Sequence, residues 1–229
     1  EYLKNMPVTV MTGFYLGADG YTWGRDYMDR TDTTHYQFLA KMWYLFAIWG
    51  RLSYNIHLPE SYFRQELSAH FGEPLPQLYE AWQNASRIVC ELNCVHWHDY
   101  DFQWYPEACC LYEQDNDKLV FANVNEFIAC SSAPKSEYDS ILEFCQARIQ
   151  KKESDKISPL AVADSIWNHA EQALQGIPAG TEKIKNSELA KTYSDIRALS
   201  FLGQYYAFKI RAAVALCTYR LTGEKSFQE

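Results

Sequence analysis

Residues 189–221 read LAKTYSDIRALSFLGQYYAFKIRAAVALCTYRL and decide the fold class of this chain. Apolar or small side chains recur in it at every third or fourth position, namely at Leu189, Tyr193, Ile196, Leu199, Gly203, Tyr206, Ile210, Ala213, Cys217 and Leu221. This is the period of an α-helix with one buried face, and Gly223 is a typical residue for its end. The glycine inside the pattern predicts a close approach to a neighbouring helix or a local bend. The sequence therefore predicts one long helix near the C-terminus.

The same period marks shorter helices upstream of the long one. Ser158 and Pro159 form a typical helix start, and Gly176 ends that helix. Further helices are predicted over 34–54, 60–71, 75–94, 119–130 and 138–149, the last one capped by Ser136 with Asp139 as its capping-box partner. The fold class is thus mainly α, an array or bundle of six to eight helices.

A short β-strand and a glycine-rich loop precede the helices. Val8–Met11 has the branched side chains of a strand, and Gly13–Asp26 contains three glycines that predict tight turns. A single strand leaves its backbone groups without partners, and the helix over 34–54 is apolar all round, which predicts burial on several sides. Both features indicate the end part of a larger protein, with an α-helical domain over 31–229.

Composition and charge narrow the classes of partner. The formal net charge is −8, whereas binding to nucleic acid needs a clustered basic face. No apolar stretch approaches the about 20 residues that cross a bilayer, and no stretch reads as a signal peptide. The seven cysteines form neither a disulfide framework nor a zinc-site spacing, so we expect mostly buried thiols. We expect no nucleic acid, no membrane span, no metal and no cofactor.

The glycine-rich loop carries side chains suited to a polar, ring-shaped ligand. Asp19, Tyr21, Trp23 and Arg25 alternate along it, and an extended backbone projects alternate residues from one face. Aromatic platforms beside charged groups can bind such a ligand. The alternatives stay open: Asp19 as a turn residue, Arg25 paired with Asp26, and the aromatics as core residues.

The segment HWHDYDFQWYPE, residues 96–107, is a second candidate site because it breaks the helical period. It gathers two imidazoles, three carboxylates and five aromatic rings. The residues in it that we expect to bind a ligand are His98, Asp101, Trp104, Tyr105 and Glu107. A metal centred on His96, His98 and Asp101 is an alternative, although the spacing supplies no further ligand. A hydrogen-bonded aromatic junction between helices is the other alternative.

Three blocks of this sequence resemble the C-terminal part of large bacterial glycoside-hydrolase-like proteins. They are GFYLGADGYTWGR at 13–25, LFAIWGRLSY at 45–54 and DIRALSFLGQYYAFK at 195–209 with Arg211–Ala213. In such proteins a (β/α)8 barrel is followed by a helical domain packed on it. The resemblance implies that residues 1–30 are a remnant of the barrel, with Val8–Phe14 as a late strand and the glycine-rich loop at the barrel's C-terminal mouth. It also implies a periplasmic or extracellular location.

The resemblance implies a function. The chain is expected to be the helical C-terminal domain of a carbohydrate-active protein, which buttresses a catalytic barrel and lends aromatic and carboxylate side chains to a glycan cleft. Glycoside hydrolysis uses two carboxylates about 5 to 10 Å apart, and the candidates here are Asp19, Asp101 and Glu107. The remaining barrel strands are lacking, so this chain alone is not expected to turn over substrate.

Two functions from other classes remain as alternatives. One is a stand-alone helical module that binds protein through aromatic surface, and the other is a metalloenzyme centred on residues 96–101. A fragment cut from a barrel should expose the apolar helix over 36–54 and self-associate, whereas a stand-alone module should be monomeric.

Overall fold

The computed structural model describes residues 42–96, 110–113, 118–133 and 137–224. These residues are mainly α-helical, as predicted, and they fall into two compact units. We call residues 1–76 the N-terminal unit and residues 77–229 the C-terminal unit. The predicted strand at Val8–Met11, the glycine-rich loop and the domain boundary at residue 30 lie outside the described residues.

In the N-terminal unit, α3 (Trp43–Tyr54) and α4 (Glu60–Phe71) pack through aromatic side chains. The ring of Trp43 stacks on that of His70, with 3.7 Å between the ring centroids. The Tyr44 hydroxyl donates to a backbone carbonyl of α4 at 3.4 Å. The second helix occupies the predicted range 60–71, and the glycine that follows it adopts the left-handed conformation of a helix end.

The burial of α3 differs from the prediction that this helix is buried on several sides. Among its residues Tyr44 is buried, whereas Leu45 is 38% exposed and Tyr54 is 95% exposed. Most of its other apolar side chains are half-buried. Within the described part of the N-terminal unit, α4 is the one further helix, and it covers the side of α3 that carries Tyr44. Part of the apolar surface of α3 therefore stays accessible.

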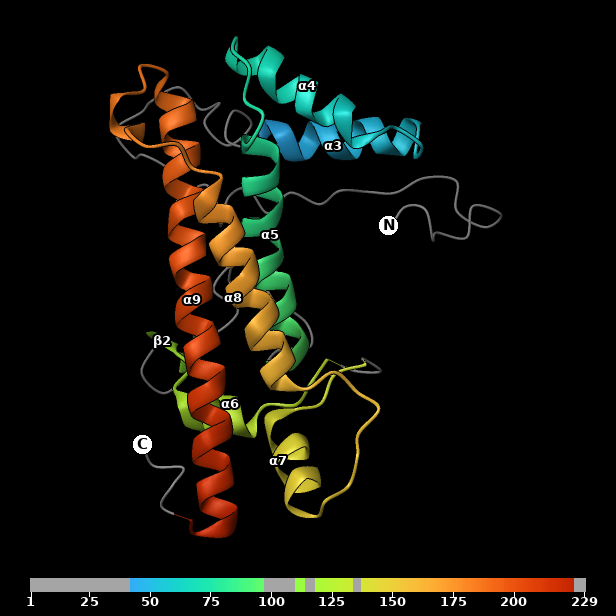
Figure 1. Cartoon of the computed structure of the whole chain (residues 1–229), viewed down its shortest axis with the longest axis vertical. Coiled ribbons are helices and arrows are strands. Elements are labelled where there is room, and N and C mark those ends of the chain that lie inside the picture. Colours follow the sequence, from blue (N-terminus) through green and yellow to red (C-terminus); the bar gives the residue numbers. More distant parts are fainter. Residues whose placement is uncertain (1–41, 97–109, 114–117, 134–136, 225–229) are drawn as a thin grey trace. The chain divides into compact units, whose positions relative to one another are not determined.

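Three long helices build the C-terminal unit: α5 (Leu78–Val95), α8 (Pro159–Gln175) and α9 (Ser187–Thr222). They lie side by side, and α8 packs against both α5 and α9 (Figure 1). The predicted start of α8 is confirmed, since the Ser158 hydroxyl accepts from the N–H group of Ala161 at 3.1 Å. The core between the helices is made by apolar side chains, among them Ile88, Leu92, Ala163, Ile166, Ala170, Tyr206, Ile210 and Ala213.

The close approach predicted for Gly203 is confirmed, and its partner is α5. A Cβ atom added at Gly203 would lie 2.8 Å from Ile88 Cδ1 and 3.1 Å from Ile88 Cγ2. Ile88 is itself fully buried, and a close-packed interior leaves it little room to move. The missing side chain of Gly203 is therefore what allows α9 to contact α5 at this point.

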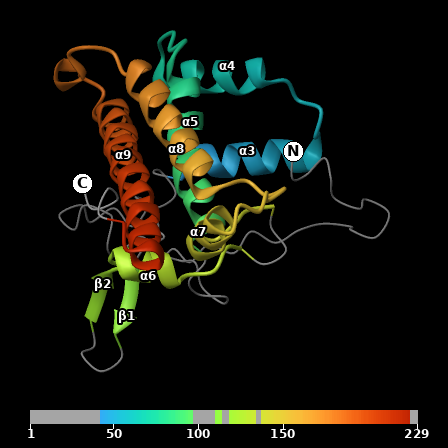
Figure 2. The same cartoon turned by 60° about the horizontal axis from the view of Figure 1, so that its bottom comes forward.

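A β-hairpin and two short helices complete the C-terminal unit. Strands β1 (Cys110–Glu113) and β2 (Lys118–Phe121) are antiparallel, with Cys110 opposite Phe121. Figure 2 shows the hairpin and α6 (Val124–Ala129) beside the C-terminal half of α9. The second short helix, α7 (Ile141–Ile149), also packs on α9.

The prediction of a helix over 119–130 is wrong in its first part. Residues 119–121 pair with β1, and the helix begins at Val124. Asn123 is its N-cap, because its side-chain oxygen accepts from the N–H group of Asn125 and its backbone N–H donates to Glu126. A short apolar run has no periodicity that separates a strand from a helix, so the hairpin partner decided the outcome.

The start predicted for the next helix is also wrong. The helix begins at Ile141, and its N-cap is Ser140 in a capping box with Glu143, where we predicted Ser136 with Asp139. The N–H group of Asp139 donates to the Ile157 carbonyl at 3.0 Å, which holds the backbone before α7 in an extended bridge. Asp139 therefore cannot take a position inside the first helical turn.

No helix within the described part of the chain combines the length and the hydropathy that crossing a membrane requires.

Gly203→Ala should destabilise the C-terminal unit, because an added methyl group would overpack the contact with Ile88 at a cost of about 1–3 kcal/mol. The ~1 kcal/mol that alanine gains over glycine in helix propensity offsets part of this cost, which leaves a net destabilisation of up to about 2 kcal/mol. Urea unfolding followed by circular dichroism measures the change. In an Ile88→Ala background the same substitution should cost much less, and an equal cost in both backgrounds would contradict the close approach. Gly50→Ala is the matched control, since nothing lies within 4 Å of a Cβ atom there.

Candidate functional site

The structure does not place the residues that the sequence predicts for a ligand site. All of them lie outside the described residues: Asp19, Tyr21, Trp23, Arg25, His98, Asp101, Trp104, Tyr105 and Glu107. Their roles stay predictions. Of the residues named for the alternative metal site, His96 is described.

His96 is a core residue at the end of α5. Its side chain is fully buried, its ring lies 4.0 Å from that of Phe127 between centroids, and its Nε2 atom lies 3.7 Å from Cys130 Sγ. Among residues 42–96, 110–113, 118–133 and 137–224, no three His, Cys, Asp or Glu side chains come together as a metal site would require. Within the described residues, His96 is therefore surrounded as a core side chain is.

The pair of Cys130 and His96 is not an activated nucleophile. Burial, with a smaller effect of the Glu126 charge, raises the pKa of the Cys130 thiol to about 11. Burial and the neighbouring Cys145 raise the pKa of Cys217 to about 12. A nucleophilic cysteine needs a lowered pKa, because the thiolate is the reactive form. These thiols are protonated at neutral pH. Cys145 and Cys217 are buried as predicted, whereas Cys90 is exposed and Cys94 and Cys130 are half-buried, contrary to the expectation of mostly buried thiols.

An aromatic surface on α9 is the strongest candidate site that the described residues contain. Phe201, Tyr205 and Phe208 are 55%, 52% and 59% exposed, and their spacing places them on one face of the helix. We call these three residues the α9 aromatic face. Exposed alanines, Ala198 and Ala212, continue this face by one turn in each direction.

Charged groups border the α9 aromatic face on the side of α8. The ring of Trp167 meets that of Phe208 edge-on, with centroids 5.2 Å apart. The Arg211 guanidinium lies 5.8 Å from the centroids of both rings, and it pairs with Asp164 Oδ1 at 2.8 Å. Flat apolar rings beside a guanidinium and a carboxylate can stack on a sugar ring and bond its hydroxyls, or bind a protein surface.

Sequence reasoning missed this surface, although its signal is present in the sequence. The 3.6-residue period of α9 predicts its buried stripe and by itself says nothing of the aromatic residues on the other side. Phe201, Tyr205 and Phe208 repeat at intervals of four and three residues, which is the spacing of one helix face. Large aromatic side chains repeated on the side opposite a buried stripe predict an exposed aromatic surface.

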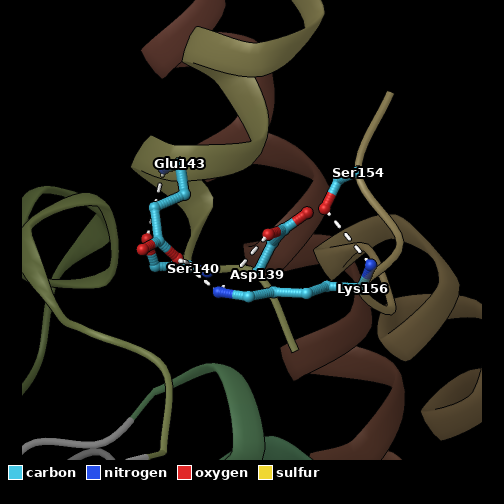
Figure 3. Close-up of polar contacts among 5 residues, drawn as sticks. All are labelled: Asp139, Ser140, Glu143, Ser154 and Lys156. Atoms are coloured by element: carbon cyan, nitrogen blue, oxygen red, sulfur yellow. Dashed lines mark hydrogen bonds and ion pairs between the residues drawn. The ribbon is translucent and has the colours of Figure 1, made fainter. Parts of the chain in front are cut away.

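A polar cluster at the start of α7 is structural (Figure 3). The Glu143 carboxylate accepts from the N–H group of Ser140 at 2.9 Å, and the Ser140 hydroxyl accepts from the N–H group of Glu143 at 3.2 Å. Lys156 Nζ lies 3.7 Å from Glu143 Oε2 and 3.9 Å from Asp139 Oδ1. Together with the bridge between Tyr138 and Ile157, these contacts tie the loop before α8 to the first turn of α7.

A polar seam between α5 and α8 is the remaining cluster of titratable side chains. His169 of α8 contacts Asn84 and Glu91 of α5 through its two ring nitrogens, at 2.7 and 3.0 Å. Two residues further along α8, Glu171 Oε1 accepts from Gln204 Nε2 of α9 at 2.6 Å. The seam therefore joins helices of the core, and within the described residues it borders no nucleophile with a lowered pKa.

Comparison with known proteins finds no matching family model, no matching curated protein and no matching solved structure.

The charge of Glu143 should contribute stability that is lost in acid. The N–H group of Ser140, followed by its hydroxyl and Lys156, holds the pKa of Glu143 below its ordinary value of 4.5. A lowered pKa means that the contribution is fully present above about pH 4.5 and disappears as the pH falls through the folded-state pKa. The free energies of unfolding of the wild type and of Glu143→Gln, measured between pH 7 and about pH 3, should differ near pH 7 and become equal in acid. A difference that is constant over this range would contradict the assignment.

Proposed function

We propose that this chain is the helical domain of a carbohydrate-active, glycoside-hydrolase-like protein, where it buttresses a catalytic barrel and contributes aromatic and carboxylate side chains to a glycan cleft. The observation that carries the proposal is the α9 aromatic face with the Arg211–Asp164 pair at its border. It lies within residues 195–213, the third block that resembles such proteins.

The α9 aromatic face has the rigid backbone that a binding surface needs. The opposite side of α9 is packed into the core, where Tyr206, Ile210 and Ala213 are fully buried. Near the same part of the helix, the Lys209 ammonium donates to the Ala122 carbonyl and lies 4.7 Å from the centroid of the Phe127 ring. Side chains on a helix held in this way keep their positions better than side chains on a loop.

The chemistry of the face suits a sugar. The apolar side of a pyranose ring stacks on an aromatic ring, and its hydroxyls need charged or polar partners at the edge of that ring. Phe208 and Trp167 supply the rings, and Asp164 and Arg211 supply the partners. The carboxylates that would act in catalysis, Asp19, Asp101 and Glu107, remain candidates for the cleft in the parent protein.

The buttressing role is supported by α3. Its half-buried apolar side chains and the exposed Leu45 leave apolar surface on a helix of only twelve residues. Accessible apolar surface can mark an interaction site in a soluble protein. A neighbouring barrel in the parent chain would cover it.

A stand-alone helical module that binds another protein is the second candidate function. The α9 aromatic face also favours this function, because Tyr, Trp and Arg are the residues that dominate protein interfaces and apolar rings suit a protein surface as well as a sugar. The two functions differ in their ligand, so binding to oligosaccharides separates them.

Binding should be measured by calorimetry against a panel of oligosaccharides, with the wild type and with Trp23→Ala, Trp104→Ala and Phe208→Ala. Saturable binding that weakens about two- to tenfold in any of these variants would support the glycan cleft and locate it, since one ring contact contributes about 0.5–1.5 kcal/mol. Tyr54→Ala is the matched control, because Tyr54 is 95% exposed and belongs to neither predicted site. A folded wild type that binds no member of the panel would contradict the glycan function.

The buttressing role makes a separate prediction about self-association. A chain that lacks its neighbouring barrel should associate through α3, and Leu45→Lys should shift it toward the monomer in sedimentation equilibrium. Phe201→Lys is the control on the other exposed apolar surface. A wild type that is monomeric at all concentrations tested would favour the stand-alone module.

A further inference from the structure

His169 is a half-buried histidine with a hydrogen-bond acceptor at each ring nitrogen. Its Nδ1 atom lies 2.7 Å from Asn84 Oδ1, and its Nε2 atom lies 3.0 Å from Glu91 Oε1. Its side chain is 15% exposed and that of Glu91 is 25% exposed. Both partners belong to α5, two helical turns apart, so the imidazole of α8 bridges them along one side of that helix.

The identity of the atom that faces Nδ1 is set by a third contact. The Asn84 amide nitrogen donates to the Glu80 carbonyl within α5 at 2.9 Å. Rotating the amide by half a turn would place its oxygen against that carbonyl oxygen, so the oxygen of Asn84 belongs on the side of the ring. An amide oxygen accepts and cannot donate, so Nδ1 must carry a hydrogen.

The other ring nitrogen faces a carboxyl oxygen of Glu91. Glu91 Oε1 lies 3.0 Å from Nε2, and within the described residues the buried Glu91 Oε2 has no hydrogen-bond partner. In its carboxylate form Glu91 accepts only, and Nε2 must then also carry a hydrogen. A neutral imidazole has one N–H group and cannot satisfy both contacts.

We infer that His169 is held as an imidazolium and acts as a charge-dependent clamp between α5 and α8. With both protons in place, the ring donates to Asn84 and to Glu91 at the same time. When one proton leaves, a ring lone pair faces an oxygen atom, and one of the two contacts is lost. The seam between the two helices is therefore tighter in mildly acidic than in mildly basic solution.

The other titratable groups near the clamp do not replace this charge. On the far side of Glu91, burial raises the pKa of Cys94 and of Tyr138, so both stay neutral through the range in which a histidine titrates. From α9, the neutral side chain of Gln204 contacts Glu171 further along α8. Among the described residues, Glu91 is thus the charged group that contacts the ring.

The protonation state can be read directly from the wild-type protein. Nitrogen-15 NMR of the histidine side chains at pH 7 distinguishes an imidazolium from either neutral tautomer. The signal of His169 is assigned by its loss in His169→Gln. Two protonated ring nitrogens at pH 7 are expected, and a neutral tautomer would overturn the inference even if the variant proves unstable.

The clamp is tested by unfolding the full chain in urea between about pH 5 and about pH 8, the range in which histidine changes charge. In the wild type, the equilibrium constant for unfolding should rise about tenfold toward the upper end, as expected for the loss of one hydrogen bond to a charged group. His169→Gln should remove most of this dependence. Glu91→Gln keeps an acceptor but removes the charge, and it should also weaken the dependence. His57→Gln is the control, since His57 is a histidine outside the seam. An unchanged pH dependence in His169→Gln would overturn the inference.

Discussion

The contact between Gly203 and Ile88 is the constraint on which the C-terminal unit depends. α9 approaches α5 closely at Gly203, and a side chain at this position would meet Ile88 at a distance below ordinary van der Waals contact. With α5 and α9 in contact, α8 packs against both and closes the core. The short helices α6 and α7 then dock on the remaining surface of α9.

Polar groups inside the C-terminal unit are used to hold its helices together. The seam of Asn84, His169 and Glu91 joins α5 to α8, and the Lys209 ammonium joins α9 to the residue before the α6 cap. A buried polar group costs free energy unless it is paired, so such contacts select one packing of the helices over others. The polar groups of the described interior therefore have a structural role, and the residues that are candidates for binding lie on the surface.

The core-facing side and the solvent-facing side of α9 have different roles. One side of α9 packs in the core, and the opposite side carries Phe201, Tyr205 and Phe208 with the Arg211–Asp164 pair close by. Rings in this setting bind any flat apolar ligand favourably. The ion pair adds directional contacts that favour a ligand with many hydroxyl groups. The proposed glycan function and the proposed clamp are independent, because the clamp acts on the seam between α5 and α8 and the binding face lies on α9.

By itself, the sequence determined the helical class, the range of α4, the start of α8 and residues 189–221 of α9, because these follow from a 3.6-residue period and from Ser, Pro and Gly at the helix ends. It also marked Gly203 as a point of close approach or of a local bend, and the tertiary structure decided for the close approach to Ile88. The start of α7 and the strand β2 were decided by the tertiary structure, since the extended bridge to Ile157 and the pairing with β1 override the local pattern. His169 meets partners 78 and 85 positions away in the chain, and no local pattern reports which side chains the packing of two helices will bring together.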